Sequence, residues 1–83
     1  SITLLWAGRF IDWKHPEMPI ELARQLKEKG YKFHLNMVGG GEMEQQLRAL
    51  VCQYNLEEQV SLAGYLQPGQ VREYMEKSQI YIL

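Results

Sequence analysis

Apolar residues gather in four short runs along the chain, at residues 2–7, 33–38, 60–64 and 80–83. Short apolar runs that end at glycine or a turn are typical of strands buried on both faces. In the second run His34 and Asn36 alternate with apolar residues, so they should point to the opposite face of the sheet. We expect these polar side chains to be satisfied within the packing or to mark an incompletely covered face, rather than to be catalytic.

The segments between these runs have apolar residues at helical spacing, which predicts three helices. Residues that start or stop helices mark their bounds: Pro16, Pro19 and Gly30 for the first, Glu42, Glu44 and Asn55 for the second, and Pro68 with Gly69 for the third. Strands that alternate with helices predict an α/β fold of Rossmann-like type. Its sheet should be parallel and covered by helices on both faces.

The composition limits the size and the partners of this fold. With 83 residues, 46% of them apolar, the chain is at most one domain. Because the last run ends without a turn or cap, we expect residues 1–83 to be a partial domain of four strands and three helices, truncated at both ends. Nine Lys and Arg against ten Asp and Glu give a net charge of −1, which provides no broad field for nucleic acid. Any anion-binding site must therefore be local.

The sequence gives no sign of a disulfide, a membrane-spanning segment or a metal site. Cys52 is the only cysteine, which excludes an internal disulfide and agrees with a reducing compartment. From its place on the second helix we expect it to be a small buried residue. No apolar run approaches the roughly 20 residues that cross a bilayer. No His, Cys or carboxylate set has metal-ligand spacing, so we expect no bound metal.

Glycines and cations follow the first two strands. Gly8 and Arg9 end the first run, with Lys14 just beyond, and residues 39–41 are three glycines that end the second. Ligands of open α/β sheets bind at the carboxyl ends of the strands, where these residues would hold a nucleotide. Two plainer alternatives stay open, because three glycines also make a tight turn and two loop cations are often only solvated surface.

Spacing separates the known modes of phosphate binding. A P-loop is excluded because the chain has no Gly-Lys-Ser/Thr triplet. A dinucleotide fingerprint matches Gly39 and Gly41, but Glu44 stands where the third glycine should be, and its carboxylate would repel a pyrophosphate. The remaining mode uses Arg9, whose planar fork matches phosphate oxygens, together with the compact charge of Lys14.

Several motifs, in order and at the expected spacing, cover nearly the whole chain. They are AGRFIDWK at residues 7–14, Ile20-Glu21, LNMVGGG at 35–41, LEEQV at 56–60, GYL at 64–66 and YMEKSQI at 74–80. Together they resemble the C-terminal donor-binding domain of the family 4 (group 1) retaining glycosyltransferases, which have the GT-B fold. We accordingly expect the strand order 3-2-1-4.

The resemblance implies roles for individual residues. Arg9 and Lys14 would bind the diphosphate of a sugar nucleotide, and backbone groups of Tyr65 and Leu66 would bind its base. Gly8 would lie beside the nucleotide, and Gly39 and Gly40 would let the chain pass close to it. Three departures concern loop geometry: His15 replaces a glycine after the lysine, Pro19 interrupts an aliphatic stretch, and Gly40-Gly41-Glu42 replaces Asp-Gly-Pro. The family's paired glutamates would follow Leu83.

The function implied is transfer of a sugar, with retention of configuration, from a nucleoside-diphosphate sugar to an acceptor held by a separate N-terminal domain. The acceptor would be a sugar or a lipid-linked glycan. No cofactor is expected, the fragment alone should be inactive, and the parent should be cytoplasmic, including the inner face of a membrane. The alternatives are a non-catalytic α/β interaction module, with the cations as surface, and an NAD-linked domain, which Glu44 disfavours.

Overall fold

The computed structural model describes residues 2–65, 67–78 and 80–82. In this part of the chain, four strands alternate with three α-helices: β1 (Ile2–Ala7), α1 (Glu17–Glu28), β2 (Phe33–Val38), α2 (Glu44–Gln53), β3 (Val60–Gly64), α3 (Pro68–Lys77) and β4 (Ile80–Ile82). A short 3-10 helix, η1 (Asp12–Lys14), lies between β1 and α1. The strands form one parallel sheet in the order β3-β2-β1-β4, which confirms the predicted fold class and strand order.

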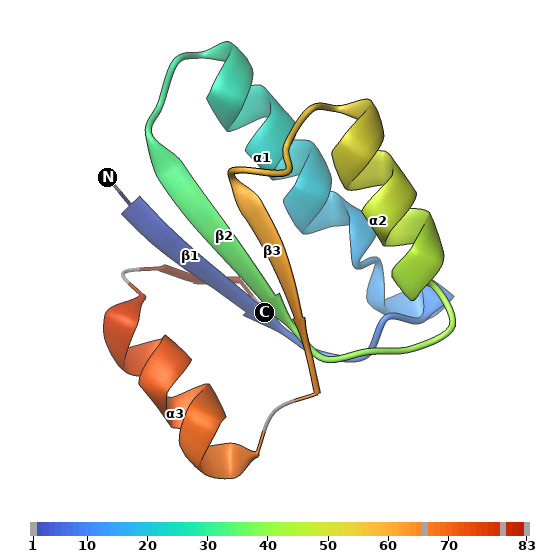
Figure 1. Cartoon of the computed structure of the whole chain (residues 1–83), viewed down its shortest axis with the longest axis vertical. Coiled ribbons are helices and arrows are strands. Elements are labelled where there is room, and N and C mark those ends of the chain that lie inside the picture. Colours follow the sequence, from blue (N-terminus) through green and yellow to red (C-terminus); the bar gives the residue numbers. More distant parts are fainter. Residues whose placement is uncertain (1, 66, 79, 83) are drawn as a thin grey trace.

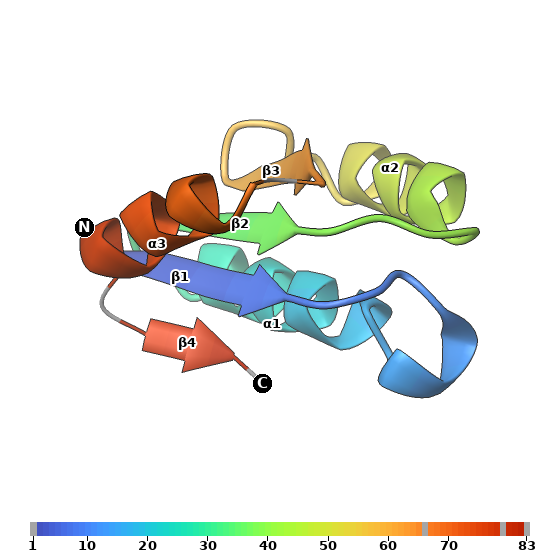
Figure 2. The ribbon, with the colours of Figure 1, turned by 90° about the horizontal axis from the view of Figure 1, so that it is seen from below.

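Helices cover both faces of the sheet, as predicted. Figure 1 shows α1 and α2 side by side on one face and α3 across the sheet from them. Figure 2 shows the sheet between these layers, with β4 at the edge next to β1. Residues in the left-handed region close the first two helices, Gly30 after α1 at φ 83° and Asn55 after α2 at φ 56°. The predicted stops of both helices are therefore confirmed.

The face under α1 and α2 is an apolar core. Alternate residues of β1 and β2 point into it, because side chains of a strand alternate between its faces. The core consists of Leu4, Trp6, Phe10, Ile20, Ala23, Phe33, Leu35, Met37, Leu47, Val51, Leu56 and Val60. Full burial of a large apolar side chain contributes about 1.5–3 kcal/mol. This layer therefore fixes α1 and α2 against the strands.

The face of the sheet under α3 is more polar than the face under α1 and α2, and side chains fill less of the space beside it. A hollow of about 510 Å³ lies between the sheet and the helix, lined by Thr3, His34, Asn36, Gln70, Glu73, Tyr74 and Lys77. His34 Nε2 lies 2.9 Å from Ser61 Oγ, at hydrogen-bond distance, and His34 is half-buried. The two alternatives predicted for this face, satisfied polar packing and incomplete cover, both apply.

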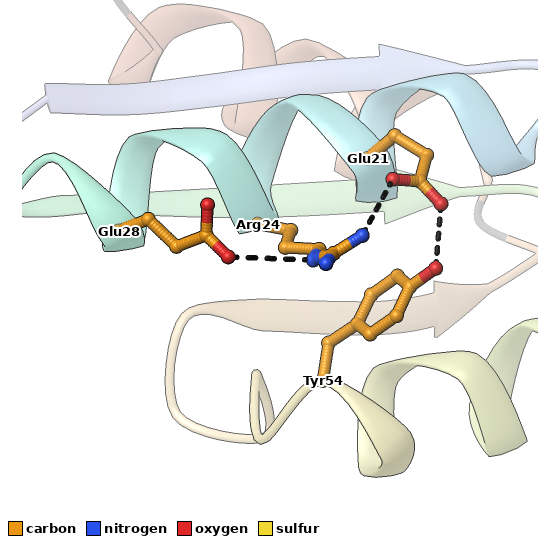
Figure 3. A network of polar contacts seen from close by, with 4 residues as sticks. All are labelled: Glu21, Arg24, Glu28 and Tyr54. Carbon is orange, nitrogen blue, oxygen red and sulfur yellow. Dashed lines mark hydrogen bonds and ion pairs between the residues drawn. The ribbon is translucent and has the colours of Figure 1, made fainter.

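A polar network joins α1 to the end of α2 (Figure 3). The Tyr54 hydroxyl donates to Glu21 Oε1 at 2.6 Å, and the Arg24 guanidinium lies 4.7 Å from the centroid of the Tyr54 ring. Arg24 also pairs with Glu21 at 3.7 Å and Glu28 at 3.5 Å. The hydrogen bond to the Glu21 carboxylate, followed by burial, raises the pKa of Tyr54, since both favour the neutral phenol.

Two details of α2 differ from the prediction. Cys52 is exposed, not buried. The buried side of α2 passes through Leu47 and Val51, and the next residue is turned about 100° around the helix axis, toward solvent. Glu42 precedes the helix, which begins at Glu44, because Gly41 and the following turn take up the chain before the first helical residue.

None of the helices that the structure describes is both long and apolar enough to span a bilayer.

Candidate functional site

The loop after β1 (residues 8–16, the β1 loop) and the loop after β2 (residues 39–43, the β2 loop) lie against each other at the carboxyl edge of the sheet. The Gly8 N–H donates to the Val38 carbonyl at 3.0 Å, and the Phe10 N–H donates to the Gly40 carbonyl at 2.9 Å. These bonds continue the pairing of β1 and β2 past the ends of both strands. The two glycine-containing segments identified in the sequence are thereby brought together at one place.

Gly39 makes the closest approach in this arrangement. A Cβ atom on Gly39 would lie 1.8 Å from the Gly8 carbonyl oxygen, and the backbone φ of Gly39 is 131°. Its N–H donates to the Gly64 carbonyl at 2.8 Å, which adds the end of β3 to the same edge. A side chain is excluded at this position for steric and conformational reasons. The glycine therefore serves contact between loops, whether or not a ligand also approaches its backbone.

Phe10 anchors the β1 loop to the apolar core. Its side chain is fully buried, and its ring stacks on Trp6 with 5.6 Å between centroids. The Phe10 carbonyl accepts from the Met43 N–H at 3.0 Å, and a Cβ on Gly41 would lie 2.7 Å from that carbonyl oxygen. Phe10 was not predicted to contribute to the site. Its apolar character between Arg9 and the polar residues of η1 was the available signal.

Tyr65 follows β3 and lies beside the β2 loop. Its side chain is 77% exposed. A Cβ on Gly40 would lie 2.6 Å from Tyr65 Cε2, so the edge of the ring lies close to the Gly40 backbone. Two residues with predicted nucleotide contacts are thus neighbours. Leu66, the other residue predicted to hold the base, lies outside the described residues.

Arg9 projects from the loop between two residues that are held in place. Gly8 is half-buried and Phe10 is buried, whereas the Arg9 side chain is exposed. Among the described residues Arg9 has no hydrogen-bond or ion-pair partner, while Arg24 and Arg48 each pair with glutamates of their own helices. Its guanidinium donors are therefore available at the carboxyl edge of the sheet.

Lys14 ends η1 on the same loop and is also exposed. Its Nζ atom lies 4.7 Å from the centroid of the Trp13 ring. The turn is closed by His15, which has φ 51° and whose N–H donates to the Asp12 carbonyl at 3.1 Å. The structure thus places both predicted cations on one loop.

The nearby hollow is unsuited to an anion. About 330 Å³ in volume, it is lined by Asp12, Glu42, Met43 and Gln46. Two carboxylates among four lining residues would repel phosphate. Across residues 2–65, 67–78 and 80–82, no three His, Cys, Asp or Glu side chains are grouped as metal ligands would be. The exposed cationic side chains of the loop after β1 are those of Arg9 and Lys14.

Comparison with known proteins gives one family over the whole chain. The family model described as "Glycosyl transferases group 1" matches residues 1–83. A protein of Escherichia coli (strain K12) named as a colanic acid biosynthesis glycosyltransferase, WcaL, is 30% identical over 82 residues. The amylovoran biosynthesis glycosyltransferase AmsK of Erwinia amylovora is 28% identical over 82 residues. These alignments cover 99% of this chain and 20% of each relative, so the chain spans about a fifth of their length.

Solved structures share the fold at lower identity. A variant of S. aureus TarM, in complex with fondaparinux, α-GlcNAc-glycerol and UDP, has a TM-score of 0.86 at 20% identity, over 95% of this chain and 16% of that one. The pneumococcal O-GlcNAc transferase GtfA, in complex with UDP and GlcNAc, has a TM-score of 0.85 at 18% identity, over 96% of this chain and 15% of that one. Both are glycosyltransferases of GT-B fold, and the predicted fold type is confirmed.

Proposed function

Because the chain belongs to the group 1 glycosyltransferase family, we propose that it forms part of the region that binds the nucleoside-diphosphate sugar in a retaining enzyme. The observation that carries this proposal is the pair of exposed cations, Arg9 and Lys14, on a loop at the carboxyl edge of the parallel sheet. That edge is where open α/β sheets bind their ligands. The UDP complexes of TarM and GtfA support a nucleotide ligand by analogy of fold.

In this proposal the two cations bind the diphosphate. Arg9 offers a planar set of N–H donors with no partner among the described residues, which suits two phosphate oxygens at once. Lys14 adds a second charge from the end of η1. The Gly8 backbone, fixed by its bond to Val38, sets the direction in which Arg9 leaves the sheet.

The nucleoside lies along the ends of the next two strands. Gly39 and Gly40 have no side chains to obstruct it, and Gly39 joins the ends of β1 and β3. Tyr65 and Leu66, directly after β3, hold the base through their backbone groups. We infer these contacts from the family resemblance and from the position of Tyr65 beside Gly40.

The chemistry requires stabilisation of a leaving group. As the bond from the sugar to the nucleoside diphosphate breaks, negative charge grows on the phosphate oxygens. Cations already in place stabilise that charge more in the transition state than in the bound donor. In this proposal Arg9 and Lys14 supply the positive charge without a metal ion. The acceptor, a sugar or a lipid-linked glycan, is bound by an N-terminal domain of a cytoplasmic or membrane-associated parent enzyme.

The test is turnover of the full-length protein carrying Arg9→Ala. Loss of one electrostatic donor to a developing oxyanion reduces turnover by about 10²-fold or more, and we expect a loss of that size. Arg72→Ala, which removes another exposed arginine from α3, is the matched control and should leave turnover unchanged. Near-normal turnover of the Arg9 variant would exclude the role proposed for this residue.

A further inference from the structure

The loop that carries both cations also exposes a tryptophan. Trp13 is the middle residue of η1 and is 70% exposed, so it belongs to no part of the core. The Lys14 ammonium lies over the face of this ring, 4.7 Å from its centroid. A cation within about 6 Å of an indole centroid is attracted by the negative face of the ring. The contact is the one side-chain interaction found for Lys14 in the described part of the chain.

We propose that Trp13 is a positioning residue for Lys14, which holds the ammonium group where the diphosphate of the donor binds. The inference rests on the proposed function of Lys14 and adds to it a second residue. Trp13 does not touch the nucleotide in this account. It acts only through the lysine, by limiting the positions that the long side chain can take.

The backbone of η1 does not by itself place the Lys14 ammonium over the Trp13 ring. Side chains at neighbouring positions of a 3-10 turn leave the axis about 120° apart, so they do not face each other by default. The Lys14 stem must fold back to bring its ammonium over the ring. The turn beneath is fixed, because the Lys14 N–H donates to the Ile11 carbonyl at 3.0 Å and the His15 N–H to the Asp12 carbonyl at 3.1 Å. The backbone of the turn is therefore held, and the freedom that remains in η1 lies in its exposed side chains.

The ring restrains the ammonium without occupying its donors. A carboxylate partner would accept N–H bonds from Lys14 and would add a negative charge beside the phosphates. The aromatic face attracts the charge yet leaves N–H donors free for phosphate oxygens. A side chain already held near its bound position loses less freedom when the ligand arrives. Trp13 should therefore increase the affinity for a diphosphate through Lys14.

The experiment is a double-substitution cycle on the full-length protein, with UDP as the probe and calorimetry as the readout. Trp13→Leu should weaken UDP binding about two- to fivefold, as expected for an exposed cation–π contact. Trp13→Phe keeps an aromatic face and should therefore retain most of the affinity for UDP. In the Lys14→Ala background, Trp13→Leu should have no further effect. Tyr31→Leu, which removes an exposed aromatic ring just before β2, is the control and should bind as the parent does.

The possible outcomes separate this inference from the proposed function. If Lys14→Ala weakens binding and Trp13→Leu does not, the positioning role is wrong while the role of Lys14 stands. If Trp13→Leu weakens binding equally with and without Lys14, the ring contacts the nucleotide itself and the inference is overturned. If Lys14→Ala binds UDP normally, the role proposed for Lys14 fails, and the role of Trp13 fails with it.

Discussion

The loops after β1 and β2 leave the same edge of the sheet but use their residues for opposite purposes. In the β2 loop Gly39 and Gly41 face neighbouring backbone, and a Cβ on Gly39 would lie 1.8 Å from the Gly8 carbonyl oxygen. In the β1 loop the side chains of Arg9 and Lys14 are exposed and have no carboxylate partner among the described residues. The β2 loop therefore builds the edge, and the β1 loop provides the charge.

Glycine and charge at the end of a strand are therefore separate signals in the sequence. Glycines at 39 and 41 are explained by close contacts within the protein before any ligand is considered. Among the described residues Arg9 has no contact that explains it in this way, and Lys14 has only its contact with the exposed Trp13 ring. Substitutions in the β2 loop should consequently lower stability, whereas substitutions of the β1 cations should lower ligand affinity at constant stability.

The largest effect on stability is expected for Gly39→Ala. The new methyl group would overlap the Gly8 carbonyl, and alanine strongly disfavours φ 131°. Strain and overpacking of this kind each cost about 1–3 kcal/mol, so we expect a loss of about 3 kcal/mol in the free energy of unfolding. Urea denaturation of the full-length protein measures it.

The matched control is Gly69→Ala on α3, where no atom lies within 4 Å of the added Cβ. There the change should be neutral or stabilising by up to about 1 kcal/mol. Equal stability of the two variants would contradict the structural role of the β2 loop.

A smaller effect is expected for Gly40→Ala, because a side chain rather than backbone stands in the way. The added Cβ would lie 2.6 Å from Tyr65 Cε2, and the exposed ring can move aside. We expect a loss of about 1 kcal/mol, at the low end of overpacking costs. The same substitution in a Tyr65→Ala background should cost nothing further, and denaturation of the four proteins gives this coupling. A loss that persists without Tyr65 would show that Gly40 is required for another reason.

The smallest effect concerns Tyr54, which supports α1 and α2 away from both loops. Its folded pKa is raised because the neutral phenol donates to Glu21, so this stabilisation is complete below the unfolded pKa near 10. It is lost as pH rises through the folded pKa. Tyr54→Phe should lower the thermal midpoint slightly at pH 8, and the difference from the parent should shrink above pH 10. A difference that stays constant up to pH 11 would contradict the hydrogen bond.

The fold was predictable from the sequence because its signals are local. Alternation over residues 33–38 placed His34 on the face opposite Leu35, and Gly30 and Asn55 marked the helix stops. Strand order came from the family resemblance, since no local pattern says which strands are neighbours. Cys52 was misplaced because the apolar stripe of α2 is narrow and a single residue step moves a side chain from core to solvent.

The sequence predicted which residues form the candidate site, but not how they are arranged. Arg9, Lys14 and the glycines were identified from their positions after strands. The contacts that arrange them join residues about 30 apart, such as Gly8 with Val38 and Phe10 with Gly40, and no sequence pattern specifies them. The position of the Lys14 ammonium over Trp13 depends on side-chain torsions and was likewise not predicted.

In the proposed function the β1 loop binds a diphosphate, and a comparison of UDP with uridine measures the contribution of that group. Calorimetric titration of the full-length protein should show UDP bound far more tightly than uridine. In a variant with both Arg9→Ala and Lys14→Ala that advantage should largely disappear, with the urea midpoint unchanged because both side chains are exposed. If the double variant keeps the full preference for UDP over uridine, the β1 loop does not bind the diphosphate.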